Sequence, residues 1–172
     1  MRLFLALTPD AEAALAIDNW RLQHWPTTGR EVPIQNFHVT LCFLGDVDER
    51  RAERLVLTLD EFVERPRGLE VEFDKPGYHP GSTVTWLAPA EPPAALMLLG
   101  KRMRTLANRA GIRVDKRPFR PHITLARRVD HPPPPPLSTP RVRIRFDRID
   151  LMESVRERSG VRYRECASWS AN

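Results

Sequence analysis

The chain has 172 residues, 41% of them apolar, which is enough to bury a core of ordinary size, so we expect residues 1–172 to form a single domain. No apolar stretch approaches the roughly 20 residues that span a bilayer, so a transmembrane helix is excluded and no membrane partner is expected. Two cysteines, Cys42 and Cys166, are too few for a disulfide framework and suit a reducing cytoplasm.

The net charge of +5 is distributed unevenly along the chain. Residues 101–172 carry 18 basic and 7 acidic side chains, and 24 of the 27 basic residues of the whole chain are arginines. Because the planar guanidinium pairs two phosphate oxygens at once, this composition favours a phosphate-bearing partner. The alternative is that the arginines reflect the base composition of the genome and lie on the solvated surface.

The first part of the chain predicts two strands and two helices. Alternating apolar residues predict a strand over 2–8, and Thr8-Pro9 predicts a helix cap followed by a helix over 10–25. A second strand is expected over 38–44. Apolar residues spaced by three and four predict an amphipathic helix over 48–64.

The second part predicts more strands and one further helix. Residues 69–73 and 83–88 read as a pair of strands, and the apolar stripe over 93–110 predicts a helix that stops at Gly111. His131 and five consecutive prolines predict an extended surface loop. The remaining predicted strands are 121–125, 142–146, 149–151 and 161–169. Strands mixed with three helices indicate the α+β class.

One tetrapeptide pattern occurs twice, as His38-Val39-Thr40-Leu41 and His122-Ile123-Thr124-Leu125, 84 residues apart. Residues i and i+2 of a strand share a face, so each copy presents an imidazole and a hydroxyl together. A strand and a helix precede each copy, which indicates an internal duplication. We therefore expect two lobes whose His-Thr pairs face each other.

Two facing histidines suit the cleavage of a phosphodiester. One neutral imidazole can take a proton from the nucleophile while the other, protonated, donates to the leaving oxygen. The threonine hydroxyls can donate to the phosphate oxygens. One such histidine alone is more often structural, but two matching copies argue for function. The other histidines, His24, His79 and His131, lack this context and are expected at the surface.

A zinc site made by His38, Cys42 and His122 is a rival interpretation, since imidazole and thiolate are good zinc ligands. The residue that corresponds to Cys42 in the second copy is Ala126, and no CxxC or HExxH spacing occurs. We therefore expect no metal and no cofactor.

At these motifs the sequence resembles the 2H phosphoesterase superfamily, and within it the LigT-like RNA 2′,3′-cyclic phosphodiesterases, also called 2′-5′ RNA ligases. The resemblance includes the opening strand at 2–7, the two blocks 36–45 and 119–127, and the closing segment 151–154 with Gly160, Tyr163 and Trp169. It implies a bilobal duplicated α+β fold, with two antiparallel sheets lining a central cleft and helices on the outside.

The resemblance also implies the reaction: a 2′,3′-cyclic phosphate end of RNA is opened to a 2′-phosphomonoester. By that analogy His38 and His122 share the acid and base roles, and we hypothesise that His122 activates water while His38 protonates O3′. Thr40, Thr124 and Arg127 would bind the phosphate.

Three details of this assignment stay open at the level of sequence. Strict alternation puts Arg127 on the face opposite His122, so either the strand ends or bulges there, or the arginine acts from the rim. Arg120 has the right parity for a substrate contact, although it could be an ordinary surface charge. Phe4, on the non-core face of the first strand, could stack a base or pack beneath the second lobe.

Other functions remain compatible with the same residues. The site could run in reverse as a ligase, could act on small cyclic nucleotides, or could belong to a non-catalytic RNA- or nucleotide-binding module. We expect a monomer, because no unexplained apolar stripe remains.

Overall fold

The computed structural model describes residues 1–62, 66–158 and 160–170, and its elements follow one another in a mixed order of helices and strands. They are β1 (Arg2–Leu7), α1 (Ala11–His24), β2 (Arg30–Glu31), the 3-10 helix η1 (Ile34–Asn36), β3 (Val39–Asp46), α2 (Glu49–Phe62), β4 (Leu69–Phe73), β5 (Lys75–His79), β6 (Val84–Ala88), α3 (Ala94–Arg109), β7 (Ile123–Arg127), β8 (Val142–Phe146), β9 (Arg148–Glu157) and β10 (Gly160–Ser170). The α+β class is confirmed.

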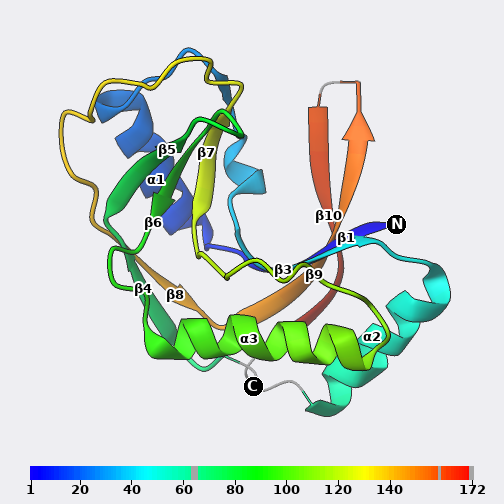
Figure 1. The fold of residues 1–172 in the computed structure, drawn as a ribbon. Coiled ribbons are helices and arrows are strands. Elements are labelled where there is room, and N and C mark those ends of the chain that lie inside the picture. The colour runs from blue at the N-terminus through cyan, green and yellow to red at the C-terminus, as the bar shows by residue number, and fades with distance from the viewer. Residues whose placement is uncertain (63–65, 159, 171–172) are drawn as a thin grey trace.

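The strands form two antiparallel sheets. Within the described residues, the larger sheet has eight strands, in the order β10-β9-β1-β3-β7-β6-β5 with β2 alongside β7, and β4 and β8 form the smaller one. Strands β3 and β7 lie between the β9–β10 hairpin on one side and the β5–β6 hairpin on the other (Figure 1). The antiparallel sheets are thus confirmed, and the single domain of two lobes stays a proposal.

The helices bury the apolar stripes that the sequence predicts. Helix α3 packs against β3 and against α2, below the sheet in Figure 1. Its predicted stripe is buried, namely Leu96, Leu99, Met103, Leu106 and Ala110. On α2 the predicted residues Ala52, Leu55 and Leu59 are buried and Val56 is partly buried. Residues 63 and 64 of the predicted second helix lie outside the described residues.

Two local predictions are wrong, and long-range contacts explain why. Asp10, not Thr8, caps α1, because its carboxylate accepts from the N–H of Ala13 at 2.7 Å. The Thr8 hydroxyl instead donates to the buried carboxylate of Asp150 at 2.7 Å. The side-chain bond that Thr8 makes is therefore set by a residue 142 positions away.

The predicted pairing of 69–73 with 83–88 is also wrong. Strand β4 pairs with β8, while β6 pairs with β5 and β7. Strand β5 has the sequence Lys-Pro-Gly-Tyr-His, which carries no apolar alternation. The sequence of β5 alone therefore does not predict its register, which is set by the pairing with β6.

The proline-rich segment is a loop, as predicted, and it is fastened to α1. The indole N–H of Trp25 donates to the carbonyl of Pro134 at 2.8 Å, and that of Trp20 donates to Ser138 at 3.1 Å. The N–H of Leu137 donates to the carbonyl of His24. Within the described residues, no helix is long and apolar enough to cross a membrane.

Arg21 joins α1 to the sheet from a buried position. Its guanidinium donates to the carbonyls of Val32, at 2.9 Å, and Leu125, at 2.7 Å, and forms an ion pair with Asp18 at 2.6 Å. The same group lies over the ring of Phe37, 5.0 Å from its centroid. The guanidinium of Arg21 therefore bonds groups from α1, from the loop after β2 and from strand β7.

Arg21→Ala should lower the free energy of unfolding by about 2–4 kcal/mol, because buried acceptors lose a charged donor and Asp18 loses its partner. Urea denaturation at pH 7 measures this as a lower midpoint at an unchanged slope. Arg51→Ala is the control, since its ion pair with Asp48 is exposed and worth less than about 1 kcal/mol. Equal shifts in the two variants would contradict the anchoring role of Arg21.

Candidate active site

The two His-Thr motifs meet where the halves of the large sheet join. Strands β3 and β7 are antiparallel and in register at Val39 and Ile123, the residues that separate His from Thr in each motif. Residues opposite each other in an antiparallel pair share a face. The register therefore puts the imidazole of each motif across from the threonine of the other, and all four side chains on one face.

Each motif strand contains a β-bulge, and the two bulges occupy matching positions. Strand β3 skips Leu41 against β1, and strand β7 skips Leu125 against β6. The pairs on either side of each bulge are Ala6–Thr40 with Leu5–Cys42, and Trp86–Thr124 with Thr85–Ala126. Because a bulge adds one residue, it reverses which face the following side chains take.

Burial shows this reversal directly. Leu125 and Ala126 are both buried in the core although they are adjacent in the strand, and Arg127, the next residue, is exposed. Arg127 therefore shares the face of His122 and Thr124. Strict alternation left open whether the strand ends or bulges near Arg127 or the arginine acts from the rim. The structure shows that the strand bulges.

The same reversal reveals an aromatic residue that the sequence reasoning missed. Phe43 stands three residues after Thr40, as Arg127 stands three after Thr124. Its side chain is 43% exposed, and the guanidinium of Arg2 lies 5.2 Å from its ring centroid. Phe43 pairs across the strands with Phe4, which contacts His38, so it belongs to the same face. A comparison of the residues that stand three positions after the threonine in the two motif copies could have identified Phe43.

Backbone carbonyls orient the two histidines in the same way. Nδ1 of His38 lies 2.7 Å from the carbonyl oxygen of Asn36, and Nδ1 of His122 lies 2.8 Å from that of Arg120. A carbonyl only accepts, so Nδ1 carries the proton and donates in both rings. Nε2 is left for chemistry in each case, and in His38 it lies 3.0 Å from the Thr40 hydroxyl.

The surroundings of the two histidines differ. The ring of His38 packs against Phe4, with centroids 4.9 Å apart, and against Tyr163 edge-on at 5.0 Å. Asn36, whose carbonyl orients His38, donates through its side-chain amide to the carbonyl of Val161 at 2.9 Å. The β9–β10 hairpin thus holds both the ring of His38 and the segment before it.

This environment lowers the pKa of His38 to about 4. Desolvation by burial is the main cause, and the positive charges of Arg127 and His122 act in the same direction, against the hydrogen bond to Asn36. His38 is therefore neutral near pH 7 in the free protein.

Two further predicted residues have defined places. Phe4 is only 3% exposed, with its ring against His38 and Tyr163, so it supports the histidine. A contact between Phe4 and a base stays a prediction, and little of the Phe4 side chain is accessible for it. The carbonyl of Arg120 orients the ring of His122. The side chain of Arg120 is exposed, and its contact with substrate stays a prediction.

Cys42 does not share the histidine face. The bulge turns its side chain into the core, where it is 6% exposed, and burial raises the pKa of its thiol to about 11. A zinc ligand must be a thiolate, so this residue is poorly suited to the rival site. In the part of the chain that the structure describes, no three His, Cys, Asp or Glu side chains cluster closely enough to hold a metal ion.

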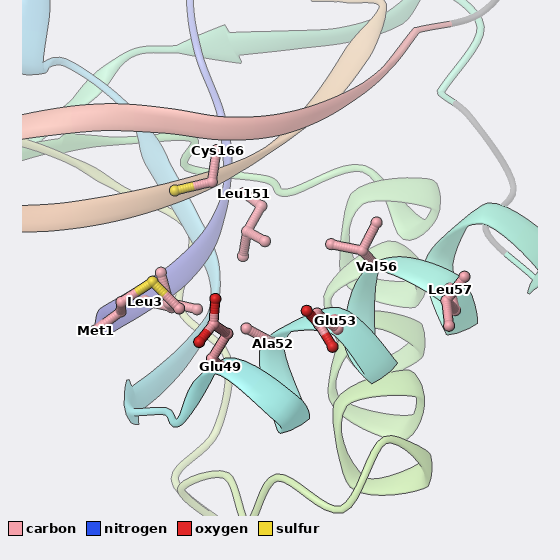
Figure 2. Close-up of a pocket in the computed structure, with 9 residues that line it drawn as sticks. All are labelled: Met1, Leu3, Glu49, Ala52, Glu53, Val56, Leu57, Leu151 and Cys166. Carbon is pink, nitrogen blue, oxygen red and sulfur yellow. The ribbon is translucent and has the colours of Figure 1, made fainter.

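A groove of about 470 Å³ lies elsewhere, between α2 and the core face of β1 and β9 (Figure 2). Its lining is apolar apart from two glutamates and a cysteine: Met1, Leu3, Glu49, Ala52, Glu53, Val56, Leu57, Leu151 and Cys166. Leu3 and Leu151 point to the face opposite Phe4, and the carboxylates would repel phosphate. The groove is therefore separate from the histidine site.

Comparison with known proteins connects this geometry to a family. Residues 9–158 match the family model of the 2′-5′ RNA ligase superfamily. A protein named RNA 2′,3′-cyclic phosphodiesterase from Escherichia coli K12 is 38% identical over 138 residues, which cover 77% of each chain. A solved structure described as a phosphoesterase superposes with a TM-score of 0.88 at 32% identity, over 98% of this chain and 97% of the other. E. coli LigT complexed with 3′-AMP gives 0.85 at 33% identity, with the same coverage.

The low pKa of His38 predicts how stability depends on pH. The unfolded chain takes up a proton on this residue below its ordinary value of 6.5, but the folded protein does so only near 4. The stability that His38 contributes is therefore complete above pH 6.5 and is lost as the pH falls toward 4. Urea denaturation between pH 7 and 4 should show a smaller loss for His38→Asn than for wild type, and an NMR titration should place the His38 midpoint near 4. A midpoint close to 6.5 would contradict the burial argument.

Proposed function

The chain belongs to the 2′-5′ RNA ligase superfamily, and on that basis we propose that it is an RNA 2′,3′-cyclic phosphodiesterase that hydrolyses cyclic RNA ends to 2′-phosphomonoesters with two histidines and no metal. The observation that carries the proposal is the register of β3 and β7, which brings His38, Thr40, His122 and Thr124 to one face. A 2′,3′-cyclic phosphate requires a 2′-hydroxyl, so the substrate is RNA or a ribonucleotide.

The phosphate would lie between the two motifs. Thr40 and Thr124 are partly exposed, and their hydroxyls can donate to its non-bridging oxygens. The guanidinium of Arg127, brought to this face by the bulge, can pair two oxygens and stabilise the charge that builds up in the transition state. Exposed Phe43 offers a ring on which a base can stack.

The two histidines would move one proton each. Nε2 of His122 takes a proton from water as the water oxygen attacks phosphorus. Nε2 of His38 donates a proton to O3′ as the P–O3′ bond breaks, which leaves a 2′-phosphate and a 3′-hydroxyl. Each Nδ1 stays bound to its carbonyl throughout, so each ring keeps its orientation.

His38 must be protonated to act as the acid, although it is neutral in the free protein near pH 7. The cyclic phosphate carries one negative charge, which favours the imidazolium when it binds beside the ring. We therefore propose that His38 takes up its proton together with the substrate. In this order His38 is neutral in the free protein and becomes protonated only when the leaving oxygen of the substrate is in place.

His38→Ala and His122→Ala should each lower kcat by about 10²- to 10⁴-fold on a short RNA that ends in a 2′,3′-cyclic phosphate, because each removes one proton-transfer group. The reaction is run with a chelator, and the product is identified by mass and by phosphatase sensitivity. His79→Ala is the matched control, since His79 is an exposed histidine that bonds Ser82, outside the site.

The outcomes separate the candidate functions. Opening to a 2′-phosphate in chelator supports the proposal. Joined RNA products would instead indicate a ligase, and RNA binding that survives in both alanine variants without any opening would indicate a binding module. Loss of activity on chelation would contradict the metal-free reaction.

Proton uptake on binding tests the role of His38. In His122→Asn, which should bind without turnover, binding of a ribonucleoside 2′,3′-cyclic phosphate should be accompanied by uptake of a measurable fraction of a proton at pH 7, since the diester itself does not titrate there. Calorimetry in buffers of different ionisation enthalpy measures the uptake, and the added change His38→Asn should abolish it. Equal uptake in both variants would assign the proton to another group.

A further inference from the structure

Trp86 lies beside the phosphate-binding face, on strand β6. It pairs directly with Thr124 on one side and with Gly77 of β5 on the other, so these three residues form one row across three strands. Paired residues share a face. The partly exposed indole of Trp86 therefore lies on the same face as the two histidines, while its neighbours Thr85 and Leu87 point into the core.

The indole lies flat over Gly77. A Cβ added to Gly77 would stand 2.1 Å from Cζ2 and 2.2 Å from Cη2 of Trp86, so no other residue leaves room for the ring there. One ring face thus rests on the backbone of β5, and the orientation of the ring is fixed. In Figure 1, β5, β6 and β7 stand next to one another, with the outer strand β5 carrying this row to the edge of the sheet.

This placement sets how far a stacked base would lie from the phosphate. The ring extends away from Thr124 over the next strand, and two strand spacings amount to roughly 10 Å. The cyclic phosphate is fused to the ribose that carries the terminal base, which keeps that base close to the phosphate. Phe43 offers a ring at a similar distance from Thr40, on the other side of the four motif residues, so one base cannot occupy both rings. The Trp86 ring suits the next base along the chain.

We propose that Trp86, seated on Gly77, is a stacking site for the base on the 5′ side of the reacting nucleotide, so that the preferred substrate has at least two nucleotides. The inference rests on the proposed function, because it assumes that the phosphate lies between the histidine motifs. Stacking on an indole accepts any base, since every base has a π face. The site therefore selects for a neighbouring nucleotide and not for its sequence.

The test compares two dinucleotides that end in a 2′,3′-cyclic phosphate, one with both bases and one whose 5′ nucleotide is abasic. Wild type should show a ratio of kcat/KM of about tenfold in favour of the complete dinucleotide, as expected for one stacked base. Trp86→Ala should bring this ratio close to one, and Trp86→Phe should retain most of it. Gly77→Ala should also reduce it, because the added methyl displaces the ring.

Leu98→Ala is the matched control, since it also removes an exposed apolar side chain, on α3, and should keep the wild-type ratio. A second readout needs no turnover. Binding of the complete dinucleotide to His122→Asn should quench tryptophan fluorescence more than binding of the abasic one, because the other tryptophans, Trp20, Trp25 and Trp169, are buried.

The outcomes are distinguishable from those of the proposed function. If wild type opens neither dinucleotide, the proposed function itself fails. If wild type opens both at equal efficiency, or if Trp86→Ala keeps the tenfold ratio, the stacking site is refuted while the phosphodiesterase stands. If Trp86→Ala does not fold, equal quenching by the two dinucleotides in His122→Asn would refute it as well.

Discussion

The site depends on one constraint of backbone geometry, the extra residue at Leu41 and at Leu125. Without these bulges, strict alternation would turn Arg127 and Phe43 into the core and bring Ala126 and Cys42 to the histidine face. The carbonyl of Leu125 accepts from the N–H of Val32 and from the guanidinium of Arg21, so the second bulge is held from outside the strand. The second bulge, and with it the position of Arg127, is thus stabilised by contacts from α1 and from the segment after β2.

The same backbone frame gives two histidines different properties. Both rings donate through Nδ1 to a carbonyl two residues earlier, which is a local and repeated device. The ring of His38 is enclosed by those of Phe4 and Tyr163, and burial lowers its pKa. The environment of His38 therefore comes from what packs around its ring, since the two motif strands themselves are so similar.

Much of this could be predicted from the sequence because it is encoded locally. The repeated His-x-Thr pattern, the stripe on α3 and the alternation in the first strand each show in their own residues, and the structure bears out the elements that they predict. The bulges could not be placed, because a bulge exists only relative to the partner strand. The pairing of β4 with β8 and the existence of β5 depend on partners in the same way.

The near-equivalence of the two motif strands raises a question of direction. A pair of identical halves related by a two-fold axis would accept a strand of RNA in either of two opposite orientations, and half of the encounters would align the wrong oxygen with the acid. In this chain the corresponding positions on and beside the two motif strands differ in kind: a ring at Phe43 against a cation at Arg127, and Ala6 against Trp86. These differences give the face a polarity, so under the proposed function a substrate with distinct ends would have a single productive orientation.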